Sequence, residues 1–370
     1  MPYPQIDANQ IRVLPLDQRK SYIQIEQAAI DPSAAAPDPG AMGGQIDRLA
    51  QRITEARGRG ASVMLVYGAH VIKNGCGPLV NALIEAGHIT HLATQGAGII
   101  HDWEFAFLGR SSESVRDNTP DGRFGTWDET GRWLSLAALA GAAEGLGWGE
   151  AVGRLVGEEG LTLPDPDALA KQVSDDPAND LAGARADLLN AMRRFDLNPG
   201  RHEVAHPYKQ YTVLEASCRK RVPLTVHPGI GYDIITNHPM FHGGAIGRAS
   251  ATDTRVFTEG VKNLSGGVYL TVGSAIMSPQ VFEKALSVAN NLLLPGEPGV
   301  PQGKRVQDHY MAVVDLQDGG GWDWSRGEPP KDSPAYYLRF CKTFARMGGT
   351  LDYICGDNRA LLANLVQRLR

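Results

Sequence analysis

The chain has 370 residues and an ordinary globular composition, with 42% hydrophobic and 21% charged residues and a formal net charge of −5. The mild negative charge, without a run of Lys and Arg among aromatic residues, argues against binding to nucleic acid. No apolar stretch approaches the roughly 20 residues that a membrane helix needs, and no secretory signal is visible at the N-terminus. The four cysteines are far apart without a CxxC pair, which favours free thiols in a reducing cytoplasm.

Apolar runs typical of strands alternate with segments of helical spacing along most of the chain. The strand-like runs are 62–68, 89–96, 221–229, 267–275 and 309–316, and the helix-like segments are 77–87, 99–109 and 278–293. A last segment, 353–369, is typical of a strand, a turn at Asp357 and a helix. This alternation predicts an α/β fold with a doubly wound, mostly parallel sheet and helices on both faces.

Residues 157–200 differ from the rest because they are acidic, rich in alanine and interrupted by prolines. We expect a peripheral helical excursion here, with solvated faces. No shift in composition divides the chain cleanly, so the prediction is one domain over residues 1–370.

Glycine-containing turns follow four of the expected strands, in the segments 67–77, 94–102, 225–239 and 271–279. Ligands of open α/β sheets bind beyond the carboxyl ends of the strands, where glycine lets a backbone approach a phosphate near a helix N-terminus. Glycine also follows strands for steric reasons alone. Together the four turns favour a nucleotide crevice, although the GxGxxG motif of a standard dinucleotide domain is absent.

Titratable side chains flank this expected crevice, among them His70, Lys73, His101 and Asp102. A histidine beside a carboxylate can act as a general base. Neighbouring residues on a helix point about 100° apart, so His101 and Asp102 are not expected to pair with each other. The alternative is that these histidines are structural. A serine triad has no support, because neither Ser111 nor Ser274 lies in a GxSxG turn.

One loop holds several groups that could bind a metal. His227, Asp233, His238 and His242 lie within sixteen residues, and imidazole and carboxylate suit zinc or iron. In the alternative interpretation the prolines and glycines make this segment an irregular loop, where His and Asp side chains cap turns.

In their order, these motifs resemble the deoxyhypusine synthase family over roughly residues 60–370. The resemblance rests on "YGAHVIKNGCGPLVNALIEAG", "HLATQGAGIIHDWE", "VPLTVHPGIGYD", "VGSAIMSPQVF" and "YICGDNRALL". It implies a doubly wound parallel sheet that binds NAD at the strand ends, with sites shared between paired subunits of a tetramer.

The resemblance also implies which positions bind NAD. The matching positions are Thr94, Gly96, Asp233, Gly273 and Asp357. Either Asp102 or Glu104 takes the place of an acidic residue near the nicotinamide ribose, and Ser274 is a further candidate for cofactor binding.

The chemistry of that family does not carry over. Arg339 aligns with the family's nucleophilic lysine, and arginine stays protonated and cannot form an imine. The family's glycine turn with Lys-His becomes "GSAIMSP", without the histidine. We therefore expect no transfer of an aminobutyl group from spermidine.

The first hypothesis is an NAD-dependent enzyme for a small polar amine or alcohol, with His101 or His70 as the proton acceptor. Asp318, Asp323 and Glu328 would attract a cationic substrate. The alternatives are a metal-dependent hydrolase or lyase that uses the loop of His227 to His242, and a catalytically silent nucleotide-binding protein.

Aromatic residues gather in one late segment, at Trp322, Trp324, Tyr336 and Tyr337. Such residues are enriched at the centres of interfaces. With the resemblance, they predict a homo-oligomer, at least a dimer and by analogy a tetramer, with residues 318–339 near a shared site. The alternative is that they pack into their own subunit's core.

Overall fold

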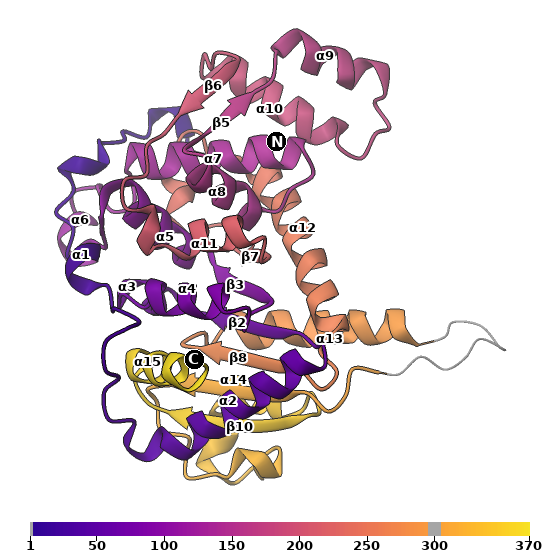
Figure 1. The fold of residues 1–370 in the computed structure, drawn as a ribbon. Coiled ribbons are helices and arrows are strands. Elements are labelled where there is room, and N and C mark those ends of the chain that lie inside the picture. Colours follow the sequence, from indigo (N-terminus) through magenta and orange to yellow (C-terminus); the bar gives the residue numbers. More distant parts are fainter. Residues whose placement is uncertain (1–2, 295–304) are drawn as a thin grey trace.

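A six-stranded parallel sheet forms the centre of the computed structural model, which describes residues 3–294 and 305–370 (Figure 1). The strands lie in the order β10-β9-β8-β2-β3-β7. Their bounds are β2 Val63–Tyr67, β3 His91–Gln95, β7 Leu224–His227, β8 Val268–Val272, β9 Tyr310–Asp315 and β10 Thr350–Cys355. The register is set by central apolar residues, with Leu65 beside Leu92 on one side and Leu270 on the other.

Both faces of this sheet are buried. Leu65 and Tyr67 of β2 point into one hydrophobic cluster, while Met64 and Val66 point into another on the opposite face. The helices α2 (Gly43–Gly58), α4 (Gly77–Glu85) and α15 (Asn358–Arg368) contribute to the first cluster. The helices α12 (Gly243–Lys262), α13 (Met277–Leu293) and α14 (Arg339–Ala345) contribute to the second. The predicted fold class is therefore confirmed.

The strand order has a direct consequence for ligand binding. In sequence order β7, β3 and β2 are the third, second and first strands of the sheet, and β8, β9 and β10 are the fourth, fifth and sixth. This is the 3-2-1-4-5-6 order of dinucleotide-binding sheets, whose order reverses between the first and fourth strands. In this protein the reversal, or switch point, falls between β2 and β8.

A long insertion separates β3 from β7 and lies beyond the β7 edge of the sheet (Figure 1). It follows α5 (Gly96–Leu108) and holds β4 (Arg110–Ser111) and the pair β5 (Gly160–Leu163) and β6 (Gly200–Glu203). Its helices are α6 Val115–Asn118, α7 Asp128–Ala143, α8 Trp148–Gly157, α9 Pro166–Asp175, α10 Ala182–Arg194 and α11 Val213–Lys220. Within residues 157–200, Leu169, Leu188 and Met192 share a separate buried cluster with α7.

The N-terminal segment runs along the outside of α5. Its strand β1 (Ile23–Gln24) pairs antiparallel with β4, so Ile23 lies beside Ser111. This pairing brings residues near position 20 to α5, which comes much later in the chain. The short elements of this segment are η1 Ala8–Gln10, η2 Leu16–Gln18, α1 Ile25–Ala28 and η3 Gly40–Met42.

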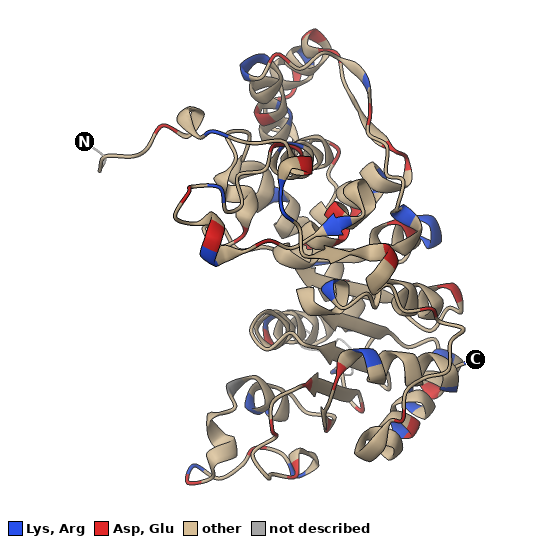
Figure 2. Ribbon diagram, turned by 90° about the vertical axis from the view of Figure 1, so that its left-hand side faces the viewer, with Lys and Arg blue, Asp and Glu red and all other residues tan. Residues whose placement is uncertain are grey.

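The remaining elements are α3 and short 3-10 turns in the connections. They are α3 Ala69–Lys73, η4 Lys209–Tyr211, η5 Ile234–Asn237, η6 Trp324–Arg326 and η7 Pro334–Tyr337. Acidic and basic residues are interspersed over the elements seen in Figure 2. Within the described ranges, no helix is both long and apolar enough to cross a bilayer.

Candidate active site

The carboxyl ends of β2 and β8 meet closely at the switch point. A Cβ atom on Gly68, directly after β2, would lie 2.0 Å from the carbonyl oxygen of Gly273, so only glycine fits there. Gly273 itself follows β8 with φ +62°, and nothing lies within 4 Å of the place where its Cβ would be. Gly68 therefore lets the two turns pack together, and Gly273 leaves one side of its backbone open to a ligand.

Exposed apolar side chains follow the same edge of the sheet. Tyr232 after β7, Ile276 after β8 and Leu316 after β9 are 73%, 75% and 74% exposed. Because the carboxyl ends of parallel strands share one edge, these side chains and Gly273 lie along the same edge of the sheet. Large apolar residues gathered at one edge mark a surface that binds a ligand or a partner.

The start of α5 is already occupied by a carboxylate. A Cβ on Gly96 would lie 2.1 Å from Oδ2 of Asp233, which accepts a hydrogen bond from the backbone N–H of Gly229 at 2.7 Å. Burial raises the pKa of Asp233 to about 6, although hydrogen bonds from the backbone N–H groups of Gly229 and Ala97 lower it. Thr94 is fully buried, and its hydroxyl donates to the carbonyl of Tyr67 at 2.9 Å. The cofactor roles expected for Thr94, Gly96 and Asp233 stay predictions.

Two further candidates lie at the starts of helices on this edge. Ser274 is 9% exposed, and its hydroxyl accepts from the backbone N–H of Ser278 at 3.3 Å in the first turn of α13. Asp357 caps α15 through the N–H of Arg359 at 2.8 Å and forms an ion pair with that side chain. The hydrogen bonds of Arg359 lower the pKa of Asp357. Both residues follow strands at this edge, and their binding of a cofactor stays a prediction.

Asp102 anchors a neighbouring helix in this structure. It is 2% exposed, and its carboxylate accepts from the backbone N–H groups of Leu214 at 2.9 Å and Val213 at 3.4 Å, at the start of α11. Burial raises its pKa to about 7, although the two N–H groups act in the opposite direction. Asp102 and His101 do not pair, and the catalytic role of Asp102 stays a prediction.

His101 instead belongs to a buried hydrogen-bond network. Its Nδ1 lies 2.7 Å from Oγ of Ser111, and that hydroxyl donates to Oε2 of Glu104 at 2.5 Å. Both oxygens of Glu104 also accept from the guanidinium of Arg19 at 2.7 Å, and Thr130 donates to Oε1 at 3.0 Å. Since the Ser111 proton is directed at Glu104, Ser111 accepts the proton of Nδ1, and Nε2 of His101 carries the free lone pair.

The charges of this network are fixed by burial and pairing. Burial alone would raise the pKa of Glu104, but the charge and hydrogen bonds of Arg19 lower it on balance. Burial lowers the pKa of His101 to about 4; the Glu104 charge opposes this, and Lys73, Arg19 and His70 lower it further. His101 is therefore a neutral base at pH 7. The cofactor role expected for Glu104 stays a prediction, since this carboxylate is 1% exposed and bound to Arg19.

His70 and Lys73 lie on α3, directly after the switch point, and α3 packs against α5. Burial and the charge of Lys73 lower the pKa of His70. The electrostatic effect of both residues on His101 places the three side chains in one neighbourhood. Their catalytic roles stay predictions.

The structure does not bring three of the four residues of the alternative metal site together. Nδ1 of His242 accepts from the N–H of Ala245 at 3.1 Å and caps α12, and Nδ1 of His238 accepts from Met240 at 3.0 Å while Nε2 faces Asp128. His227 packs edge-on against Phe257, and Asp233 lies at α5. In residues 3–294 and 305–370, no three His, Cys, Asp or Glu side chains are placed to share a metal ion.

The aromatic residues of the late segment, 318–339, differ in their exposure. Trp324 is 3% exposed and packs in the core, and Trp322 lies against Arg326, whereas Tyr337 is 75% exposed. Lys342 lies over the ring of Tyr336. Arg339 begins α14, and its side chain lies outside the described part of the structure.

The acidic residues expected to attract a cation are partly engaged. Glu328 pairs with Arg346, and Asp323 accepts from Ser325 at 2.6 Å. Asp318 accepts from the N–H of Gly320 at 2.6 Å in the loop after β9. Their attraction of a substrate stays a prediction.

Sequence reasoning missed Arg19 and Ser111. Arg19 is 85 positions before Glu104, and no local pattern connects them. Ser111 follows α5 by a few residues, which is a weak indication that it lies near His101. Sequence motifs test Ser111 only as a nucleophile and not as a hydrogen-bond partner of His101. Ser111 is fully buried and orients His101.

Comparisons with known proteins found no matching family model and no matching curated protein. Among solved structures, unliganded AgrE is 14% identical with a TM-score of 0.42, covering 91% of this chain and 34% of its own. ArgZ, an arginine dihydrolase from cyanobacteria, is 13% identical with a TM-score of 0.42, covering 88% and 32%. An LOR/SDH protein from Methanococcus maripaludis S2 is 14% identical with a TM-score of 0.40, covering 92% and 73%.

This chain therefore spans about a third of the length of AgrE and ArgZ. AgrE has also been solved as a ternary complex with ornithine and NAD+. None of these proteins is described as a deoxyhypusine synthase. Of what the resemblance in the sequence implies, the structure bears out the α/β fold class. A likeness at these identities and TM-scores carries no argument about activity.

Proposed function

We propose that this protein is an NAD-binding enzyme that acts on a small polar amine or alcohol. The observation that carries the proposal is the strand order, because a 3-2-1-4-5-6 sheet binds dinucleotides at its switch point. The neutral histidine on α5, which packs against the helix α3 that follows this point, supports an enzymatic role over a silent binding protein.

The edge of the sheet suits a dinucleotide in two respects. The open side of Gly273 allows a phosphate to approach the backbone before α13, and the exposed Ile276 offers an apolar surface to a ring. Gly273, Ser274 and Ile276 are the residues that would hold the cofactor. When bound, NAD would supply the hydride acceptor.

His101 is the group of this chain suited to take the substrate proton. Its Nε2 lone pair is free while Nδ1–H is held by Ser111, and the Arg19–Glu104 pair fixes Ser111 in turn. An alcohol that loses hydride must also lose its O–H proton to become a carbonyl compound, and an ammonium substrate must lose one N–H proton before its carbon can release hydride. The protein thus supplies a base whose tautomer is fixed before the substrate binds.

Calorimetric titration with NAD+ tests the cofactor. Ile276→Ser should weaken binding by about tenfold, since the burial of an apolar side chain contributes more than about 1 kcal/mol. The fold should be retained, because Ile276 is the N-cap residue of α13, where serine is favoured. Leu292→Ser is the matched control: Leu292 is 64% exposed near the other end of the same helix, and its replacement should leave the affinity unchanged.

Absence of heat from NAD+ with folded protein would refute the cofactor assignment. The catalytic assignment needs a second experiment, in which the absorbance of NADH is followed with a panel of small amines and alcohols. His101→Gln should retain NAD+ affinity and lose at least about 100-fold of any turnover found, which is the range of general base catalysis. Unchanged turnover in that variant would move the role to another group, with His70 next to be tested.

A further inference from the structure

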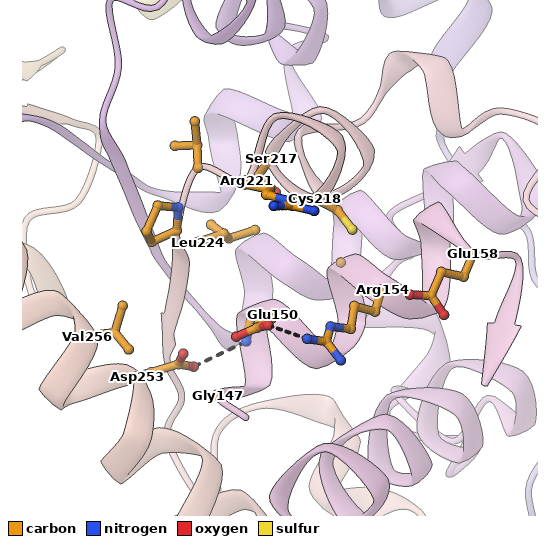
Figure 3. Close-up of a pocket in the computed structure, with 14 residues that line it drawn as sticks. Gly147, Glu150, Arg154, Glu158, Ser217, Cys218, Arg221, Leu224, Asp253 and Val256 are labelled. Carbon is orange, nitrogen blue, oxygen red and sulfur yellow. Dashed lines mark hydrogen bonds and ion pairs between the residues drawn. The ribbon is translucent and has the colours of Figure 1, made fainter. Parts of the chain in front are cut away.

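A cavity of about 550 Å³ lies on the opposite side of β7 from the sheet interior, near the amino end of that strand (Figure 3). Its walls are α8, the end of α11, the chain leading into β7, and α12. The proposed cofactor crevice lies at the carboxyl ends of the strands, so the two places are distinct. The volume falls within the range of small-molecule sites.

Glycine keeps part of this space open. A Cβ on Gly153, inside α8, would lie 3.5 Å from the carbonyl oxygen of Leu214 and 3.6 Å from Cβ of Cys218, which are ordinary contacts. Packing therefore does not require glycine here, although a glycine inside a helix is destabilising relative to alanine. At Gly149, by contrast, a Cβ would lie 1.8 Å from the oxygen of Leu224, so glycine is needed for packing.

Two opposite charges at the cavity lack partners. Arg154 is engaged by Glu150 at 2.8 Å and Glu144 at 3.5 Å. Within the described ranges, neither the guanidinium of Arg221 nor the carboxylate of Glu158 has a hydrogen bond or ion pair. Figure 3 shows them on different walls, Arg221 at the end of α11 and Glu158 after the last turn of α8.

The cavity thus has an unpaired cation, Arg221, on one wall and an unpaired anion, Glu158, on another. This arrangement suits a ligand that carries a negative and a positive charge at separate positions. We propose that this cavity binds a small zwitterion with separated charges, such as a short peptide. Its carboxylate would pair with Arg221, its ammonium group with Glu158, and its body would lie over Gly153 beside Cys218. This site is independent of the proposed cofactor site.

Calorimetric titration of the whole protein with triglycine tests the proposal, with N-acetyl-triglycine amide as the uncharged control. We expect saturable binding of triglycine at about millimolar concentration and none of the capped peptide. Arg221→Asn and Glu158→Gln should each weaken binding by about tenfold. Asparagine is chosen because Arg221 has φ +53°, a conformation that asparagine tolerates.

Two more variants complete the design. Gly153→Leu should abolish binding by filling the cavity, with the melting temperature measured to show that the variant is folded. Arg193→Gln removes an exposed arginine on α10, outside the cavity, and should change nothing. Absence of triglycine binding to the wild type, retained binding in Arg221→Asn, or binding of inorganic phosphate as tight as that of triglycine would overturn the proposal.

Discussion

Arg19 and Glu104 show at the scale of single residues how this protein keeps charges in its interior. Both side chains are 1% exposed, and two hydrogen bonds of 2.7 Å join them. A buried charge is tolerated when it is paired, whereas removal of one partner leaves the other uncompensated.

Arg19→Ala should therefore lower the free energy of unfolding by about 3–5 kcal/mol. The double variant Arg19→Met with Glu104→Gln should lose much less, because no unpaired charge remains and the new amide oxygen can still accept from Ser111. Urea denaturation at pH 7 measures both. A double variant as unstable as the single one would show that the shape of the ion pair, and not its charge balance, matters.

His309 is a buried histidine that the proposed function does not use. It is 1% exposed, neither ring nitrogen has a hydrogen-bond partner among the described residues, and burial lowers its pKa to about 4. A histidine in the unfolded chain has a pKa of about 6.5. The unfolded state therefore binds the proton first, and the stability contributed by neutral His309 is lost as the pH falls from about 6.5 towards 4.

His309→Leu should remove this dependence. Between about pH 7.5 and pH 5, the variant should gain about 2 kcal/mol in unfolding free energy relative to the wild type, which is the effect of one such group over about 1.5 pH units below its unfolded pKa. Urea denaturation at the two pH values gives the comparison. If the unfolding free energy falls equally in both proteins, protonation of His309 does not destabilise the folded state.

At the scale of elements, the carboxylate of Asp253 joins α12 to α8 and to β7. From α12, its Oδ2 accepts from the backbone N–H groups of Trp148 at 3.0 Å, Gly149 at 3.2 Å and Val226 at 3.0 Å. It thereby caps the start of α8 and accepts the hydrogen bond of a backbone N–H group on the edge strand β7. Burial raises the pKa of Asp253 to about 7, although these three N–H groups lower it.

Asp253→Ala should lower the free energy of unfolding by about 3 kcal/mol or more, because three buried N–H groups lose their acceptor.

Asp253→Asn keeps one acceptor oxygen, and this variant tests the effect of ionisation of the Asp253 carboxyl group on stability. The folded wild type retains the proton up to about pH 7 while the unfolded chain releases it near pH 3.9, so the wild type loses stability as the pH rises towards 7.

The Asn variant lacks that loss. Its unfolding free energy relative to the wild type should rise by about 2–3 kcal/mol between about pH 5 and pH 7.5. Thermal and urea unfolding at both pH values measure the difference. A constant difference would indicate that Asp253 is already ionised at the lower pH in the folded protein.

At the scale of the whole molecule, the carboxyl edge of the sheet exposes several large apolar side chains. We propose that another copy covers it and that the protein is at least a dimer, and by analogy a tetramer. Leu316 and Tyr337, 74% and 75% exposed within or next to the late aromatic segment, support this proposal.

Light scattering at micromolar concentration should report a multiple of the 39.8 kDa chain mass. Tyr337→Ser should shift the protein towards the monomer, because it removes a large apolar contact from the interface. Tyr22→Ser is the control, since Tyr22 is 55% exposed on the N-terminal segment. A wild type that is monomeric under these conditions would refute the proposal.

By itself the sequence determined the sheet. Continuous apolar strands such as 62–68 and glycine turns such as the one at Gly68 are local patterns, and they predicted the strands, the parallel arrangement and the edge with the polar turns. Local patterns did not determine which side chains at that edge are free. Asp233 is a candidate ligand residue by its position in the sequence, and only the fold shows that its carboxylate lies against Gly96.

The tertiary structure alone decided the order of the strands and the partners of His101. The strand order depends on how the connections cross the sheet, and no single connection records it. Ser111 reaches His101 because β4 pairs with β1, and Arg19 reaches Glu104 along the same N-terminal segment. Burial then sets the charges, since a histidine pKa of about 4 and a paired glutamate follow from surroundings that only the folded chain creates.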